Sequence, residues 1–347
     1  MMTITGYCLE WQTITHGGSA HDLIVEPLMQ YVDVQLKGWD GVSWPGDAGN
    51  VQHSGFPIIF SHLPPPPELL ENSRARLVWL PMWDHARGYS QEWWDALPKS
   101  LRVVAFSNAV AQKARAAGLP TLRLRYFENP GTFEPARWNN DRVLMYWNRT
   151  GMIGPRFVKK LCAALKIDKM LFRAQIDRRI PEQAAYRLPA RLGRTIVEEL
   201  PGLMLRAEYL RVLEQANVFI APRLYEGVGM TFLEALAQGC AVFGFDAPTM
   251  NEYITHGEDG YLLQPFLPSM KNKFLPKINR FMKPRLLRLG IGESSSFEHP
   301  VTEYQDWCAI GALDLEKLGR TARQRHQIGF VEWQKSIPEY ARFVLEW

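Results

Sequence analysis

The sequence predicts an α/β fold in which two Rossmann-like domains follow one another, with a deep cleft between them. Strands and helices alternate along the first half of the chain, which is typical of a parallel sheet covered by helices on both faces. A stretch rich in proline, glycine and asparagine follows at 128–142, and the alternation then restarts. The length of 347 residues suits two domains of ordinary size.

The first half of the chain is expected to form the first domain, 1–138. Apolar runs bounded by polar or proline-rich segments predict strands within 3–10, 32–41, 56–67, 77–85 and 101–108. Helical patterns cover 21–30 and 108–118, and Gly118 closes the second of them.

The second half is expected to form a second domain, 139–325, and a C-terminal helix, 326–347. The same patterns predict strands at 141–148, 169–176, 217–222 and 240–246, with helices at 155–166, at 209–216 and from about Gly229. The last helical stretch is expected to break at Pro338. In doubly wound sheets ligands bind beyond the carboxyl ends of the strands, so candidate site residues are sought there.

Composition and charge argue against several classes of protein. Hydrophobic residues make up 46% and charged residues 22% of the chain, as in soluble globular proteins. Neither a signal peptide nor an apolar run long enough to span a membrane is recognisable, so a cytoplasmic location is expected. The four cysteines are expected to be reduced and structural, and no metal-ligand spacing occurs. A net charge of +4 gives no argument for nucleic acid binding.

Two glutamates lie on either side of the start of a predicted helix. Glu226 precedes the sequence GVGMT at 227–231, and Glu234 follows eight positions after the first glutamate. Helix N-termini bind phosphates, and glycines let a ligand approach the backbone. At the helical rise the carboxylates are roughly 10–12 Å apart, about the span from sugar to ribose in a nucleotide diphosphate sugar. On spacing alone, a helix with one solvated glutamate remains the alternative.

The residues around the two glutamates form a longer motif. The core reads PRLYEGVGMTFLEALAQG at 222–239, followed by Asp246, Glu252 and HGEDGY at 256–261. Together, 217–263 closely resembles the donor-binding signature of retaining glycosyltransferases of the GT-B fold, in the large family 4 group. The resemblance implies two Rossmann-like domains facing each other across a cleft, with a C-terminal helix that crosses back and packs on the first domain.

The resemblance also assigns roles to individual residues. Glu226 would hold hydroxyls of the transferred sugar and Glu234 the ribose, while Arg149 matches the family's phosphate-binding arginine. The family usually has a lysine about five residues later, where this chain has Gly-Pro-Arg, so Arg156 is the candidate for the second phosphate contact. The residues assigned to donor binding are Gly17, Gly18, Arg149, Arg156, Gly227, Val228, Gly229, Met230, Thr231 and Glu234.

Two parts of this assignment have alternatives or gaps. Gly17 and Gly18 match a family glycine pair that faces the donor phosphates, and a simple tight turn before a helix is the alternative. Pro248 and Thr249 replace a usual glycine pair, and the family's motif after the second strand is absent. The base and the sugar of the donor are therefore not predicted.

The catalytic residues expected besides Glu226 are His85 and Asp84. This pair follows an apolar strand, near where family members carry a cleft histidine or His-Asp pair. His62 is the second candidate, and either histidine could instead be an ordinary loop residue. Ser107 matches a family serine at a helix start and is expected to be a cap.

The resemblance implies a metal-independent glycosyltransferase that needs no cofactor, acting in bacterial surface polysaccharide or glycoconjugate synthesis. Its partners would be a nucleotide-sugar donor and a glycan or lipid-linked glycan acceptor, with retention of anomeric configuration. Two alternatives stay open: a nucleotide-sugar epimerase of the same fold, and a non-catalytic partner subunit that binds a nucleotide or a glycan.

A basic amphipathic segment lies at 270–288. It contains seven lysines and arginines and no acid, interleaved with large apolar residues. Such a segment can lie on anionic lipid, which would place the protein peripherally on the inner face of the membrane. A solvated face of an insertion is the alternative.

Overall fold

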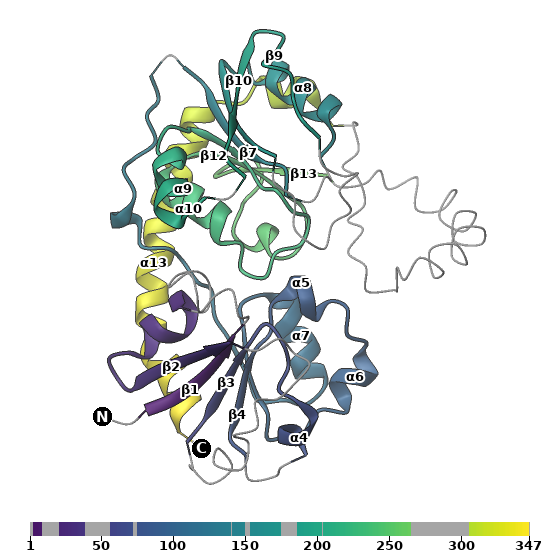
Figure 1. The fold of residues 1–347 in the computed structure, drawn as a ribbon, viewed down its shortest axis with the longest axis vertical. Coiled ribbons are helices and arrows are strands. Elements are labelled where there is room, and N and C mark those ends of the chain that lie inside the picture. Colours follow the sequence, from purple (N-terminus) through teal and green to yellow (C-terminus); the bar gives the residue numbers. More distant parts are fainter. Residues whose placement is uncertain are drawn as a thin grey trace, which may run out of the picture. The chain divides into compact units, whose positions relative to one another are not determined.

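The structure, a computed structural model, describes most of the chain and divides it into two units (Figure 1). The described residues are 3–8, 21–38, 56–71, 75–139, 141–149, 153–174, 186–202, 204–264 and 305–346. Contacts group Met1–Glu128, Tyr225–Met230 and Gln327–Trp347 into unit 1, and Asn129–Leu224 and Thr231–His326 into unit 2. The domain limits expected from the sequence, after 138 and 325, stay predictions.

Unit 1 contains a six-stranded parallel sheet in the order β2-β1-β3-β4-β5-β6. Its strands are β1 (Thr3–Cys8), β2 (Asp33–Gly38), β3 (Ile58–Ser61), β4 (Leu77–Leu80), β5 (Arg102–Ala105) and β6 (Thr121–Arg123). All residues of β3 and β4 are buried, which explains why these strands are continuous apolar runs. The strand order reverses at β1, so β1 and β3 end at the switch point of this sheet.

The helical segments of unit 1 before its C-terminal part are short, apart from one. They are η1 (His21–Val25), α2 (Glu26–Leu28), α4 (Pro67–Leu70), α5 (Trp83–Ala86), α6 (Gln91–Asp95) and α7 (Asn108–Ala116). The side chain of Ser107 caps α7, since its Oγ accepts a hydrogen bond from the Val110 amide at 3.2 Å. Gly118, just beyond the helix, has a φ of 70°, a conformation that favours glycine.

The stretch 77–85, predicted as one strand, is a strand followed by a helix. The strand β4 ends at Leu80 because Pro81 has no amide hydrogen to continue the ladder. The carbonyl of Met82 then accepts the amides of His85 and Ala86, which starts α5. Asp84 and His85 therefore project from a short helix and not from the end of a strand.

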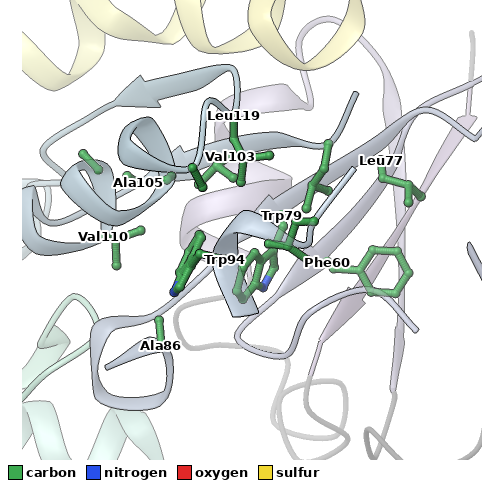
Figure 2. Packing of buried hydrophobic residues seen from close by; sticks show 14 of the residues in the cluster. Phe60, Leu77, Trp79, Ala86, Trp94, Val103, Ala105, Val110 and Leu119 are labelled. Carbon is green, nitrogen blue, oxygen red and sulfur yellow. The ribbon is translucent and has the colours of Figure 1, made fainter. Parts of the chain in front are cut away.

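An aromatic core fixes the strand β4 against the helices of unit 1. Trp79 of β4 and Trp94 of α6 stack at a ring-centroid distance of 5.0 Å, and neither side chain is exposed. Phe60, Ala86 and Val110 belong to the same cluster, from β3, α5 and α7 (Figure 2). This packing ties α5, and with it Asp84 and His85, to the centre of the sheet.

Unit 2 contains a seven-stranded sheet in the order β13-β12-β11-β7-β8-β10-β9. Its elements are η2 (Pro130–Thr132), β7 (Val143–Trp147), α8 (Pro155–Ala164), β8 (Lys169–Arg173), β9 (Arg191–Leu192), β10 (Thr195–Leu200), α9 (Arg206–Leu213), β11 (Val218–Ile220), α10 (Met230–Gln238), β12 (Ala241–Phe245), η4 (Met250–Glu252), β13 (Tyr261–Leu263) and α12 (Trp307–Gly311). Only β9 pairs in the antiparallel sense. Without it, the order is that of the doubly wound dinucleotide-binding fold.

One long helix, α13 (Leu315–Leu345), shown in yellow in Figure 1, contributes its first part to unit 2 and its second part to unit 1. The expected break at Pro338 is wrong, since the helix continues through this residue. Proline removes one backbone hydrogen bond, but a buried face of the helix compensates. Trp333 and Tyr340 are almost fully buried, and the Tyr340 hydroxyl donates to the Leu23 carbonyl at 2.9 Å. Over the described ranges, no helix combines the length and the apolar character needed to cross a membrane.

Candidate functional site

The strand order of unit 2 reverses between β7 and β11, which is where a doubly wound sheet binds its ligands. Beyond the carboxyl end of β7, the chain continues through Asn148 to Arg149. Beyond the end of β11, it leads through Pro222 to Glu226 and then to α10. The motif predicted from the sequence thus begins at the carboxyl end of a switch-point strand.

Two guanidinium groups lie on one indole ring at the ends of β7 and β8. The Cζ atom of Arg149 is 4.9 Å from the ring centroid of Trp147, and that of Arg173 is 4.2 Å away. Trp147 and Arg173 are partners in the β7–β8 register, so their side chains leave the sheet on the same face. Arg173 is buried, and its Nε donates to the Gly202 carbonyl at 2.8 Å. This edge of the sheet suits an anionic ligand.

Glu234 is a buried carboxylate in the second turn of α10. Its side chain is 2% exposed, and Oε1 lies 2.7 Å from Nη1 of Arg206, the first residue of α9. All residues of α10 from Phe232 to Gln238 are buried, because the helix lies inside unit 2. The alternative of a solvated second glutamate is therefore wrong.

A tyrosine hydroxyl shares the environment of this ion pair. Tyr209 follows Arg206 by three positions on α9, so the two side chains lie on one face of the helix. Burial raises the pKa of Tyr209 well above its ordinary value, and the Glu234 carboxylate raises it further, whereas Arg206 and Arg173 oppose the shift. The hydroxyl stays protonated, and it has no hydrogen-bond partner among the residues that the structure describes. It can donate to a ligand.

The loop before α10 groups with unit 1 by its contacts. The guanidinium of Arg87 lies 4.4 Å from the ring centroid of Tyr225. Gly227 approaches α5 so closely that a Cβ atom there would lie 2.7 Å from Met82 Cβ and 3.1 Å from Asp84 Oδ1. Glycine is required here for a close approach. Glu226, the residue before it, is buried.

Two histidines of unit 1 lie edge to face beside this loop's docking surface on α5. The ring centroids of His62 and His85 are 5.8 Å apart. Nδ1 of His85 is 3.3 Å from Asp84 Oδ1, so the carboxylate accepts the Nδ1 proton of the ring. His62, at the carboxyl end of β3, has its Nδ1 2.8 Å from Ser61 Oγ and a φ of 69°. A histidine in this conformation at a switch point indicates a constrained position.

The structure brings the predicted residues together in two groups. In unit 1, Asp84 and His85 lie close to the loop with Glu226 and Gly227, in which Val228 is buried and Gly229 has a φ of 82°. Glu234 lies in the part of α10 that belongs to unit 2, and the helix begins with the half-buried Met230 and Thr231. The functional roles of these residues stay predictions.

Other predicted residues lie apart or outside the described chain. Arg156 is exposed in the first turn of α8, and Arg149 instead shares its indole with Arg173. Gly17, Gly18 and the basic segment 270–288 lie outside the described residues. Within the described residues, no group of three or more histidine, cysteine or acidic side chains could hold a metal ion.

Sequence reasoning missed Arg173, Arg206 and Tyr209. Arg173 ends the apolar run KMLFR, and a cation at the carboxyl end of a buried strand is the signal that could have found it. Arg206 and Tyr209 lie on α9, far from Glu234 in the sequence, and only the fold brings them to it.

Comparison with known proteins finds a family match for the region that contains Arg206, Tyr209, Glu226 and Glu234. Residues 199–294 match the family model described as glycosyl transferases group 1. The chain is 36% identical over 58 residues to the UDP-N-acetylglucosamine–peptide N-acetylglucosaminyltransferase GtfA subunit of Streptococcus pneumoniae, covering 16% of this chain and 12% of that protein. It is 29% identical over 114 residues to the sucrose synthase of Melioribacter roseus, covering 32% and 14%. Both alignments thus span a small part of the relatives.

Solved structures resemble the chain over nearly its whole length. Sucrose-phosphate synthase from Thermosynechococcus elongatus matches with a TM-score of 0.59 at 14% identity, covering 99% of this chain and 98% of that one. HepE of Anabaena in complex with UDP matches with a TM-score of 0.57 at 14% identity, covering 98% and 99%. A glycosyltransferase from Rickettsia africae matches with a TM-score of 0.56 at 13% identity, covering 99% of each chain. The chain therefore has the GT-B fold, and residues 199–294 carry the sequence of the glycosyl transferases group 1 family.

Proposed function

We propose that the chain is a glycosyltransferase that moves a sugar from a nucleoside diphosphate sugar to a glycan or lipid-linked glycan acceptor. The observation that supports this most is the buried, ion-paired Glu234 inside the region that matches glycosyl transferases group 1. Burying a carboxylate is costly, and its position in a ligand-binding helix favours a role in holding ligand hydroxyls. The uridine nucleotides named with the relatives make a UDP-sugar the first donor to test.

Departure of the nucleoside diphosphate requires positive charges near its phosphates more than it requires a general acid. A nucleoside diphosphate is a good leaving group once its charge is neutralised, so guanidinium groups and helix N–H groups can replace a general acid. Arg149 and the N-terminus of α10 supply such groups, which supports a reaction without a metal ion or a cofactor. Retention of anomeric configuration follows in this proposal from the resemblance of the motif.

The acceptor side of the proposal uses unit 1. His85, held by Asp84, presents Nε2 to a polar group near the anomeric carbon, and Glu226 holds the hydroxyls of the transferred sugar. In this proposal the sugar transfer serves bacterial surface polysaccharide or glycoconjugate synthesis.

Donor binding and turnover test the proposal in sequence. Thermal unfolding with UDP-, GDP- and dTDP-sugars identifies a donor by an increase in melting temperature, and the same donor is then incubated with candidate glycan acceptors in the presence and absence of EDTA. NMR of the product gives its anomeric configuration. No shift with any nucleotide sugar would contradict the proposal. Isomerised donor without transfer would identify an epimerase, and binding without turnover a non-catalytic partner.

Membrane contact is part of the proposal for a lipid-linked acceptor. Its support is the basic, acid-free sequence 270–288, which lies outside the described residues. We expect the protein to co-sediment with vesicles containing phosphatidylglycerol, and a variant with the seven cations replaced by glutamine to lose this binding. Equal binding by both proteins would remove membrane contact through this segment.

A further inference from the structure

The sequence motif does not show which residue supplies the second positive charge of the proposed diphosphate site. Arg149 follows β7, but the lysine that the family motif usually places about five residues later is replaced by Gly-Pro-Arg. Arg156, the remaining candidate, is exposed in the first turn of α8. A diphosphate carries at least two negative charges, so a single arginine leaves much of its charge to be neutralised.

Arg173 has the geometry that this role requires. It is the last residue of β8, the strand next to β7, and both strands end at the same edge of the sheet because they are parallel. Its guanidinium is 4.2 Å from the ring centroid of Trp147, on which the guanidinium of Arg149 also lies at 4.9 Å. The indole thus gathers two cations at the end of the switch-point strand.

The position of Arg173 is fixed before any ligand binds. Its side chain is 7% exposed, and its Nε donates to the Gly202 carbonyl at 2.8 Å, which sets the plane of the guanidinium. A guanidinium held in this way at the end of a strand next to the switch point is already oriented to bind an anion.

Arg173 also belongs to the electrostatic environment of the predicted ribose site. Burial is the main cause of the raised pKa of Tyr209, and Glu234 adds to it, while the charges of Arg206 and Arg173 act in the opposite direction. The charge of Arg173 therefore acts on Tyr209, which lies beside the ion pair of Glu234 and Arg206. An arginine on the surface of α8 has no such relation.

We propose that Arg173 is the second cation that binds the diphosphate of the donor, together with Arg149. This inference rests on the proposed function, since it takes the ligand to be a nucleoside diphosphate sugar. It moves the second phosphate contact from Arg156 on a helix surface to a buried residue at the end of β8.

Calorimetry with a nucleoside diphosphate and its monophosphate tests the inference. The diphosphate used is whichever of UDP, GDP and dTDP binds the wild type most tightly. The variants are Arg173→Gln, Arg156→Gln at the rival position, and the surface control Arg211→Gln. We expect Arg173→Gln to weaken diphosphate binding by roughly 10- to 100-fold and monophosphate binding by much less, because a charge-assisted contact to the terminal phosphate is lost. Arg211→Gln, at an exposed residue of α9, should leave both affinities near those of the wild type.

The outcomes separate this inference from the proposed function. If the wild type binds none of the three diphosphates, the proposed function fails and the inference with it. If the wild type binds but Arg173→Gln keeps the ratio of the two affinities, Arg173 has a structural role only and the inference alone fails. The inference is also overturned if Arg156→Gln, and not Arg173→Gln, weakens diphosphate binding. Should Arg173→Gln not fold, Arg173→Lys keeps the charge, loses the planar fork and is expected to reduce the same ratio by a smaller factor.

Discussion

The carboxylate of Glu234 on α10 is held by the guanidinium of Arg206 on α9, with 2.7 Å between Oε1 and Nη1. The carboxylate is almost fully buried, while Arg206 is 39% exposed and so remains partly hydrated. The ion pair fixes the direction of the carboxylate, whose two oxygens are hydrogen-bond acceptors of the kind that bind ligand hydroxyls. The pair therefore positions Glu234 for the ribose that the proposed function assigns to it.

Replacement of the two motif glutamates separates ribose binding from chemistry. Glu234→Gln is expected to weaken nucleotide binding by about 1–3 kcal/mol, because a charge-assisted hydrogen bond is lost. Glu226→Gln is expected mainly to lower kcat, because contacts to the transferred sugar can strengthen as charge develops at the anomeric carbon. Calorimetry with the free nucleotide and steady-state kinetics with the donor measure the two effects.

Two results would contradict this assignment. A loss of nucleotide affinity in Glu226→Gln, with Glu234→Gln unchanged, would reverse the two roles along the ligand. Wild-type behaviour of both variants would remove the glutamates from the site altogether.

Arg206→Gln tests the positioning role of the ion pair itself. The glutamine cannot neutralise Glu234, so the buried carboxylate loses its cationic partner and its pKa is expected to rise. Nucleotide affinity should then fall, and fall further at lower pH as Glu234 becomes protonated, whereas wild-type affinity should change little over the same range. Arg211→Gln, an exposed arginine on the same helix, is the matched control. Identical pH profiles for Arg206→Gln and the wild type would rule out positioning of the carboxylate by Arg206.

The parts of the fold that were predictable are those in which one local pattern decides the structure. The strands β3 and β4 are buried throughout, so each is an unbroken apolar run that predicts a strand. The strand β10 escaped prediction because Glu198 and Glu199 are exposed within it and interrupt the pattern. The continuation of α13 through Pro338 depends on packing of buried residues such as Tyr340, which no local pattern contains.

The candidate site likewise contains residues that a local motif identifies and residues that only the fold relates to them. Glu226 and Glu234 lie in one short motif, so the sequence alone identifies both as candidate site residues. Arg173 and Arg206 contribute from other elements, and their relation to Trp147 and Glu234 arises only when the strand order of unit 2 is known. The sequence motif thus pointed to the two glutamates and Arg149, and the fold was needed to relate Arg173 and Arg206 to them.

Gly227 is expected to tolerate no side chain. An added Cβ would lie 2.7 Å from the Cβ of Met82, so the loop or α5 must move. Overpacking of this kind costs typically 1–3 kcal/mol. Gly227→Ala should therefore lower the melting temperature and reduce transfer. Gly154→Ala, at a glycine with no atom within 4 Å of an added Cβ and with a φ of −73°, is the control and should change neither quantity. A stable, fully active Gly227→Ala variant would contradict the tight docking of this loop on α5.

The reactivity of the cysteines is expected to follow their burial. Burial raises the pKa of Cys8 to about 11 and that of Cys162 to about 12, and it raises the pKa of Cys240 further. The thiolate is the reactive form, so a disulfide reagent at pH 8 should modify only the exposed Cys308 in the native protein. Rapid modification of more than one thiol, or of any thiol in Cys308→Ser, would contradict this expectation.

The same shifts predict how stability depends on alkaline pH. The folded-state pKa values lie above the ordinary value of 9.0, so these buried thiols stay protonated in the native protein after they ionise in the unfolded one. Their contribution is fully present below pH 9 and is lost as the pH rises toward the folded values of about 11 and 12. Urea unfolding at pH 8 and at pH 10.5 should show a lower free energy of unfolding at the higher pH. An unchanged value would contradict it.

His85 is expected to act on the acceptor side. Asp84 fixes its Nδ1, and Nε2 is left for a substrate group. His85→Ala should lower transfer by on the order of 10²-fold or more while nucleotide affinity persists, because the side chain lies in unit 1 and the nucleotide residues in unit 2. Asp84→Asn should give a smaller loss, since the amide can hold the ring but stabilises its charged form less.

His62 provides the comparison that decides between the two histidines. Its backbone has a φ of 69°, which asparagine adopts more readily than most residues, so His62→Asn removes the imidazole with little change in backbone strain. If His85 carries the reaction and His62 only packs against it, His62→Asn should keep most of the transfer activity that His85→Ala loses. A large loss in His62→Asn with near wild-type transfer in His85→Ala would move the acceptor-side role from α5 to the end of β3, and equal losses in both would assign it to the pair.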